Sequence, residues 1–106
     1  MIITITPNPA VDRTLTVGTV QTGAIHRATH SIVAAGGKGL NVARAIRQLG
    51  GSVMAIGLVG GYSGQWIASL AAAEGIDGNW TWTDQETRTC TMVVAEGSDA
   101  TVFNES

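Results

Sequence analysis

The sequence predicts an α/β fold in which parallel strands alternate with helices, with a second, smaller β-sheet exposed beside them. A helix-like pattern over residues 38–49 precedes a near-continuous apolar run over residues 52–59, which is typical of a strand covered on both faces of a parallel sheet. A second helix-like pattern follows this run. Threonine-rich segments with alternating polar and apolar residues lie before and after this unit, and they predict the separate exposed sheet.

The first third of the chain predicts three strands. Residues 1–6 (MIITIT) read as a short buried strand, and the prolines of residues 7–9 end it. Residues 11–17 alternate apolar and polar side chains, which indicates a half-exposed strand. After a turn, residues 25–34 predict a second exposed strand that carries Arg27.

The middle of the chain predicts two helices, each ended by a glycine. In AGGKGLNVARAIRQLG (residues 35–50), the first helix runs from about Lys38 to Leu49 and stops at Gly50. Its expected core-facing residues are Val42, Ala43, Ile46 and Leu49, whereas Asn41, Arg44 and Arg47 are expected to turn away. The second helix ends at Gly75. Three more strands are expected over residues 79–83, 87–96 and 99–104.

Composition limits the classes of function. The chain has 106 residues, a net charge of -2 and one cysteine, Cys90. This charge provides no basic surface for nucleic acid or for a membrane, and one cysteine cannot form an internal disulfide. The sequence shows neither a signal peptide nor a membrane span, so we expect a soluble cytoplasmic protein. Because the sequence stops directly after a strand-like segment, we also expect it to be a fragment of a longer chain.

The glycine cluster suggests a ligand site at the start of the first helix. It does not fit the Walker loop, which needs Ser or Thr after its Gly-Lys pair, nor the dinucleotide turn, because Val42 stands where a small residue is required. The free amides and positive dipole of a helix N-terminus favour oxygen-rich or anionic ligands. Gly36 and Gly37 would let a ligand approach, Lys38 adds a charge and Asn41 adds an amide. The alternative is a tight strand-to-helix connection with a solvated lysine.

Two further charged residues have structural and functional interpretations. Asp12 follows the proline break, where an aspartate commonly caps a turn or lies in solvent. Arg88 lies in ETRTC at the start of a predicted strand, where it could be an exposed edge charge. The local sequence does not choose between these interpretations and a role in binding.

Four segments in this order resemble the N-terminal part of the PfkB sugar kinases. They are TPNPAVDRT (6–14), AGGKGLNVARAIRQLG (35–50), GLVGGYSG (57–64) and TRTCTMVV (87–94). The resemblance covers the whole chain and is nearest to the phosphosugar branch, which holds 1-phosphofructokinase and tagatose-6-phosphate kinase. It implies a ribokinase-like three-layer αβα fold with a mostly parallel central sheet and a small exposed β-sheet lid. Residues 1–106 would be the N-terminal part of one kinase domain, with lid strands at about 11–34 and 87–104 and core elements at about 1–6 and 36–76.

The resemblance also implies an activity and roles for individual residues. ATP would phosphorylate a hexose phosphate, and the pattern favours D-fructose 1-phosphate as the substrate and fructose 1,6-bisphosphate as the product. Asp12 would hold sugar hydroxyls in a pocket lined by Gly36, Gly37 and Asn41, while Lys38 and Arg88 would meet the substrate phosphate. A homodimer through the lid strands is implied, in which Arg27 could reach the partner's site. The catalytic base and the sites for ATP and Mg²⁺ are expected outside these residues.

Several alternatives remain open on sequence alone. The substrate could be tagatose 6-phosphate or fructose 6-phosphate, because the glycine cluster with its lysine does not settle the choice within the branch. The chain could instead be a non-catalytic phosphosugar-binding module that uses the same residues. It could also be a structural α/β unit whose glycines only make turns. Neither a catalytic residue nor a metal ligand is assigned within the chain.

Overall fold

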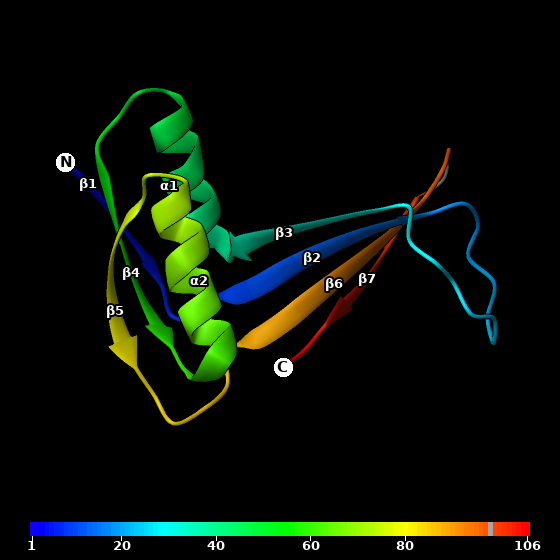
Figure 1. Ribbon diagram of the computed structural model, residues 1–106. Coiled ribbons are helices and arrows are strands. Elements are labelled where there is room, and N and C mark those ends of the chain that lie inside the picture. The colour runs from blue at the N-terminus through cyan, green and yellow to red at the C-terminus, as the bar shows by residue number, and fades with distance from the viewer. Residues whose placement is uncertain (98) are drawn as a thin grey trace.

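Two β-sheets and two helices make up the part of the chain that the computed structural model describes, residues 1–97 and 99–106 (Figure 1). The first sheet has three parallel strands, in the order β1 (Ile2–Thr6), β4 (Val53–Val59) and β5 (Asp77–Trp82). The predicted mixed α/β class with a parallel sheet is therefore confirmed.

The second sheet has four strands and extends away from the helices (Figure 1). Its order is β3 (His30–Gly36), β2 (Ala10–Val17), β6 (Arg88–Ala95) and β7 (Ala100–Asn104). The central pair β2 and β6 is parallel, whereas β3 and β7 are antiparallel to their neighbours. The start of β2 thus lies beside the start of β6, although 78 positions separate Ala10 from its partner Arg88.

The core lies between the parallel sheet and one layer formed by α1 (Lys38–Gln48) and α2 (Gly61–Ala73). Alternate residues of β4 point into this core, and Ala55 and Val59 are almost fully buried. Leu40 of α1 and Ile67 of α2 pack against them with no exposed surface. This period-two burial is what a strand with one covered face produces.

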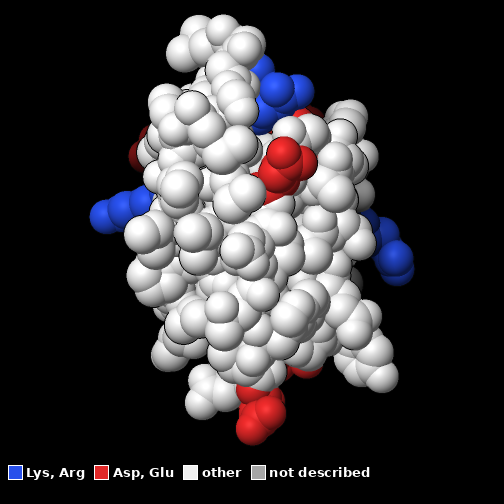
Figure 2. Space-filling model, turned by 90° about the vertical axis from the view of Figure 1, so that its left-hand side faces the viewer, with Lys and Arg blue, Asp and Glu red and all other residues white. Residues whose placement is uncertain are grey.

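The opposite face of the parallel sheet is open, which corrects two expectations. β1 was expected to be buried and β4 to be covered on both faces, but Ile3, Ile5 and Leu58 are 56%, 67% and 46% exposed. Figure 2 looks onto this side of the molecule and shows few charged residues across its middle. Apolar side chains on both faces of a strand predict two covering layers, and only one layer is present among the described residues.

The strand expected over residues 25–34 begins later, at His30, and ends at Gly36. Arg27 therefore lies in the loop before β3 and not on a strand, so its predicted placement is wrong. The loop is held by local contacts, because the amide of Gln21 donates to Nε2 of His26 at 2.9 Å and the amide of Thr29 donates to the carbonyl of Thr16 at 2.8 Å. These contacts replace the strand pairing that the alternating pattern had indicated.

The predicted core face of α1 is also partly wrong. Val42 and Leu49 are 51% and 88% exposed, whereas Leu40 and Ala43 are completely buried. The helix is rotated so that Arg44, expected to turn away, lies toward α2. Both glycine stops are confirmed, because Gly50 and Gly75 have φ angles of 85° and 73° that favour glycine.

Candidate functional site

A cavity of about 410 Å³ lies between the N-terminus of α1 and one face of the four-stranded sheet. Its lining residues are Asp12, Arg13, Thr14, Gly37, Lys38, Asn41, Arg88, Cys90, Thr91, Met92, Val102 and Asn104. Five of the six residues predicted to bind substrate are among them. The structure therefore brings together side chains that lie far apart in the sequence.

The sheet register explains why Asp12 and Arg88 share this cavity. In the parallel pair, Ala10 lies opposite Arg88, and Asp12 lies opposite Cys90. Residues two apart on a strand point to the same face, so Arg88 and Asp12 are diagonal neighbours on one side of the sheet. A carboxylate and a guanidinium are thus presented to the same space.

Asp12 is a half-buried acid whose pKa is raised above its ordinary value. Burial is the largest cause, because it penalises the charged carboxylate, and the positive charges of Arg88 and Arg44 oppose the increase. A half-buried carboxylate has fewer hydrogen-bond donors around it than one in water. A ligand with hydroxyl groups would supply them.

Gly36 and Gly37 allow the connection from β3 to α1 to lie close to β1 and β2. A Cβ at Gly36 would overlap the Asp12 carboxylate, so only glycine leaves that side chain in its position. Gly37 has a φ of 116° and directly precedes α1, and a Cβ there would overlap Cγ2 of Thr6. The glycines thus set the distance between the sheet and the helix at the edge of the cavity.

The free backbone amides at the two helix N-termini have different hydrogen-bond partners. At α2, the amide of Ser63 donates to Oε2 of Glu86 at 2.6 Å. Hydrogen bonds from the backbone and side chain of Ser63, and from the backbone of Tyr62, lower the pKa of Glu86. At α1, no side chain in the described residues caps the N-terminus, and its first turn contains no acidic residue. The N-terminus of α1, which borders the cavity through Gly37 and the exposed Lys38, therefore has no capping side chain at the positive end of its dipole among the described residues.

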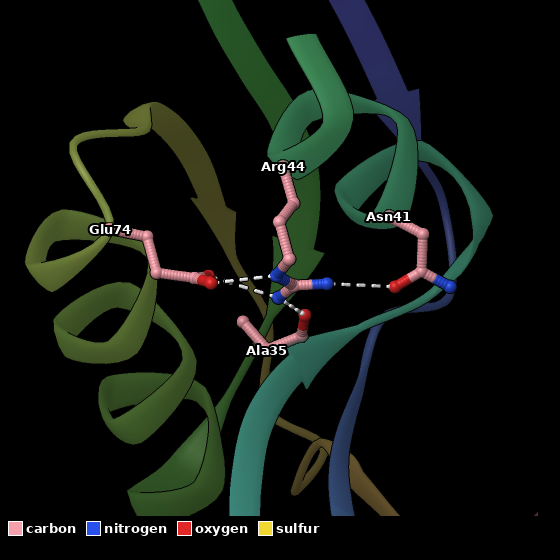
Figure 3. A network of polar contacts seen from close by, with 4 residues as sticks. All are labelled: Ala35, Asn41, Arg44 and Glu74. Carbon is pink, nitrogen blue, oxygen red and sulfur yellow. Dashed lines mark hydrogen bonds and ion pairs between the residues drawn. The ribbon is translucent and has the colours of Figure 1, made fainter. Parts of the chain in front are cut away.

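The side chain of Asn41 is held by a hydrogen bond from Arg44, a residue that the sequence prediction missed (Figure 3). Nη1 of Arg44 donates to Oδ1 of Asn41 at 3.0 Å, and Nη2 donates to the carbonyl of Ala35 at 2.6 Å. Nε and Nη2 also donate to the two carboxylate oxygens of Glu74, at 2.7 and 2.9 Å. Thirty positions separate Arg44 from Glu74, so no local pattern could have indicated this pair.

Arg88 is half-buried inside the sheet, and not an exposed edge charge, because β6 lies between β2 and β7. Nη2 donates to the carbonyl of Asn8 at 3.2 Å, and Nη1 makes a long contact of 3.4 Å with the carbonyl of Glu105. Its Nε is buried without a partner among the described residues. Arg88 also lines a second cavity of about 470 Å³, beyond Pro7 and Leu58.

Seven more residues line the cavity without having been predicted, namely Arg13, Thr14, Cys90, Thr91, Met92, Val102 and Asn104. Thr14 and Cys90 follow the same alternation as Asp12 and Arg88, so the strand period could have indicated them. Arg27, by contrast, does not line this cavity and borders a separate hollow with its own loop.

The described residues do not supply a metal centre, because no three of their His, Cys, Asp or Glu side chains are grouped to hold an ion. The donor set of the cavity is one carboxylate with cationic and amide groups, which suits an oxygen-rich anion better than a cation. No helix within the described residues is long and apolar enough to cross a membrane.

Residues 3–106 match the pfkB family of carbohydrate kinases, and the chain belongs to this family. A 1-phosphofructokinase of Haloferax volcanii is 42% identical over 96 residues, which cover 90% of this chain and 32% of that protein. The chain thus spans about a third of the length of this curated relative.

Solved structures give the same picture of the fold. A possible 1-phosphofructokinase of Thermotoga maritima aligns with a TM-score of 0.91 at 31% identity, covering 99% of this chain and 35% of that one. Phosphofructokinase-2 of Escherichia coli in complex with fructose-6-phosphate aligns with a TM-score of 0.90 at 34% identity, covering 96% of this chain and 34% of that one. A tetrameric inhibited form of that Escherichia coli protein has also been solved.

Proposed function

We propose that the gene product carrying this chain is a phosphosugar kinase that converts D-fructose 1-phosphate and ATP to fructose 1,6-bisphosphate and ADP. The observation that carries this proposal is one cavity lined by Asp12, Lys38, Asn41 and Arg88. The family and the name of the Haloferax relative support the same activity.

The charges in the cavity suit a sugar that already bears a phosphate. The half-buried Asp12 carboxylate can accept hydrogen bonds from two neighbouring hydroxyls, which would supply the donors that it lacks. Lys38 and Arg88 offer a point charge and a planar fork to the phosphate, and the uncapped amides of α1 add partial positive charge. A neutral sugar would offer these cations no negative charge.

In the proposed reaction a hydroxyl oxygen of the bound sugar attacks the γ-phosphorus of ATP. A new P–O bond forms, the bond to the bridging oxygen breaks, ADP leaves, and the hydroxyl proton passes to a base. ATP and Mg²⁺ are proposed because the family consists of kinases. The described residues of this chain do not themselves form a metal site. We therefore assign this chain's residues to binding and orientation of the sugar, not to a catalytic step.

We also propose a division of the chain into a lid and a core, and a mode of assembly. We propose that the four-stranded sheet is a lid over the sugar, with lid segments at about 11–34 and 87–104 and a core at about 1–6 and 36–76. β5 lies outside both sets of ranges and pairs with β4 in the parallel sheet. We further propose a homodimer through the lid strands, with Arg27 near the partner's site, and a cytoplasmic location where ATP and sugar phosphates are available.

Kinetics with a set of sugars test the proposal. ADP release by the gene product should show its highest kcat/KM with fructose 1-phosphate, compared with fructose 6-phosphate, tagatose 6-phosphate and free fructose. A preference for fructose 6-phosphate would favour the alternative suggested by the Escherichia coli neighbour, which was solved with that sugar phosphate. Tight binding of a phosphosugar without ADP release would instead indicate a non-catalytic binding module.

A further inference from the structure

The amide of Asn41 needs a partner to decide which of its two ends faces the cavity. The terminal torsion of asparagine is broad and roughly two-fold, so the oxygen and the nitrogen can exchange places at little cost. In the structure the oxygen is occupied by Nη1 of Arg44 at 3.0 Å. The nitrogen is consequently left on the side away from Arg44 (Figure 3), where neither of its N–H donors is bonded to another of the described residues.

Arg44 is itself held in one orientation by two other elements. Glu74, directly after α2, accepts from Nε and Nη2, so the guanidinium plane is fixed by a bidentate contact. The carbonyl of Ala35 accepts from Nη2 at 2.6 Å, and Gly36, against which the Asp12 carboxylate packs, is the next residue. One guanidinium therefore connects the end of β3, the first turns of α1 and the end of α2.

We propose that Arg44 is a positioning residue of the phosphosugar cavity, which directs the amide nitrogen of Asn41 toward the ligand and holds the end of β3 beside Asp12. Arg44 does not line the cavity and acts through Asn41 and Ala35. The inference rests on the proposed function for its effect on the sugar, but not for its effect on the Asn41 amide. Lysine cannot replace the contact, because it lacks the planar fork that reaches three partners at once.

The Asn41 amide can be observed directly by NMR with asparagine-selective ¹⁵N labelling of the gene product. Arg44→Lys should shift the side-chain amide resonances of Asn41 in the ligand-free protein. The matched control is Arg47→Lys, on the same helix. Within the described residues the side chain of Arg47 donates to the carbonyl of Gly51 at 3.3 Å and makes no hydrogen bond with Asn41, so this substitution should leave the resonances unchanged. Unchanged Asn41 resonances in a folded Arg44→Lys variant would overturn the inference.

A kinetic cycle measures whether Arg44 acts through Asn41. We expect Arg44→Lys and Asn41→Ala each to raise the KM for fructose 1-phosphate by about tenfold, with little change in the KM for ATP. The double variant should be little worse than the worse single variant, because both changes remove one interaction. Independent multiplication of the two effects would overturn the coupling.

Two controls separate the possible failures. If Arg44→Lys does not fold, Glu74→Gln carries the test, because it loosens the guanidinium from α2 and should move the Asn41 resonances in the same experiment. Unmoved resonances in that folded variant would contradict the inference. If Asn41→Ala leaves the KM for every sugar phosphate unchanged, the proposed function of the cavity fails, whereas the NMR comparison still decides the role of Arg44.

Discussion

Asp12 lies half-buried beside the cavity with Arg88 and Arg44 near enough to influence its charge. Burial nevertheless outweighs the two arginines, and the pKa of Asp12 is raised. The carboxylate is therefore unfavourable for the ligand-free fold at neutral pH. This trade-off between stability and binding is common for side chains that must remain charged in order to bind a ligand.

Asp12→Asn should separate stability from binding. Because the pKa is higher in the folded than in the unfolded state, protonation of Asp12 favours folding, and the penalty is largest above the folded pKa. The variant should melt at an equal or higher temperature than the wild type at neutral pH, and this advantage should shrink as the pH falls toward about 4. Its KM for the phosphosugar should rise at least about tenfold, since it loses charged hydrogen bonds.

Thermal melts across this pH range, together with sugar kinetics at neutral pH, check both parts. A variant that melts lower than the wild type at neutral pH, by a deficit that disappears as the pH falls toward about 4, would show that the charge of Asp12 stabilises the fold. Unchanged kinetics with the phosphosugar would show that Asp12 does not bind the sugar and is only a turn residue.

Glycines allow the elements around the cavity to approach one another closely. Gly39 of α1 packs against β1, and a Cβ there would lie 2.2 Å from Oγ1 of Thr6 and 2.7 Å from the carbonyl oxygen of Ile5. The carbonyl belongs to the backbone and cannot rotate away. The first turn of α1, which carries Lys38 and Asn41, is thereby held close to the end of β1.

Gly39→Ala should destabilise the protein, although alanine is the better helix former. The overlap forces α1 away from β1 at a cost of about 1–3 kcal/mol or more, which exceeds the gain of up to about 1 kcal/mol in helix propensity. Gly18→Ala is the matched control, because nothing lies within 4 Å of a Cβ there, and it should change the free energy of unfolding by less than about 0.5 kcal/mol. Urea unfolding measures both; equal stability of the two variants would disprove the packing argument.

The sequence predicted those parts of the site that depend on local spacing. The glycine cluster indicated Lys38 and Asn41, because their placement follows from the start of their own helix, whereas the binding roles of Asp12 and Arg88 were implied only by the family resemblance. Arg44 and Glu74 escaped prediction because their contact depends on how two helices are placed together. The strand expected at residue 25 failed for a related reason, since polar and apolar residues also alternate in a loop that makes its own hydrogen bonds.

At the scale of the whole molecule, the two sheets differ in how they are covered. The parallel sheet buries one face under α1 and α2, and its other face exposes an apolar patch. We define this open-face patch as Ile3, Ile5, Met54, Ile56 and Leu58, which share one side by strand register. An apolar run predicts that a strand can be covered on both faces, but only the tertiary arrangement determines which faces are covered.

The 106-residue chain by itself should self-associate through the open-face patch. Ile5→Lys places a charge at the most exposed member of the patch, at 67%, and should reduce association. Leu49→Lys is the control, because Leu49 is 88% exposed at the end of α1 and lies outside the patch. Light scattering over a concentration series measures this; a monodisperse wild-type monomer at high concentration would contradict the prediction.

The central claim is that the cavity recognises a sugar through its phosphate, and Arg88 tests it most directly. Titration calorimetry of the gene product should compare fructose 1-phosphate with free fructose, in the wild type and in Arg88→Lys. The variant keeps the positive charge but loses the planar fork, so affinity for the phosphosugar should fall by about tenfold or more while the weaker binding of fructose barely changes. Loss of both affinities by the same factor would show that Arg88 does not contact the phosphate, and would contradict the account.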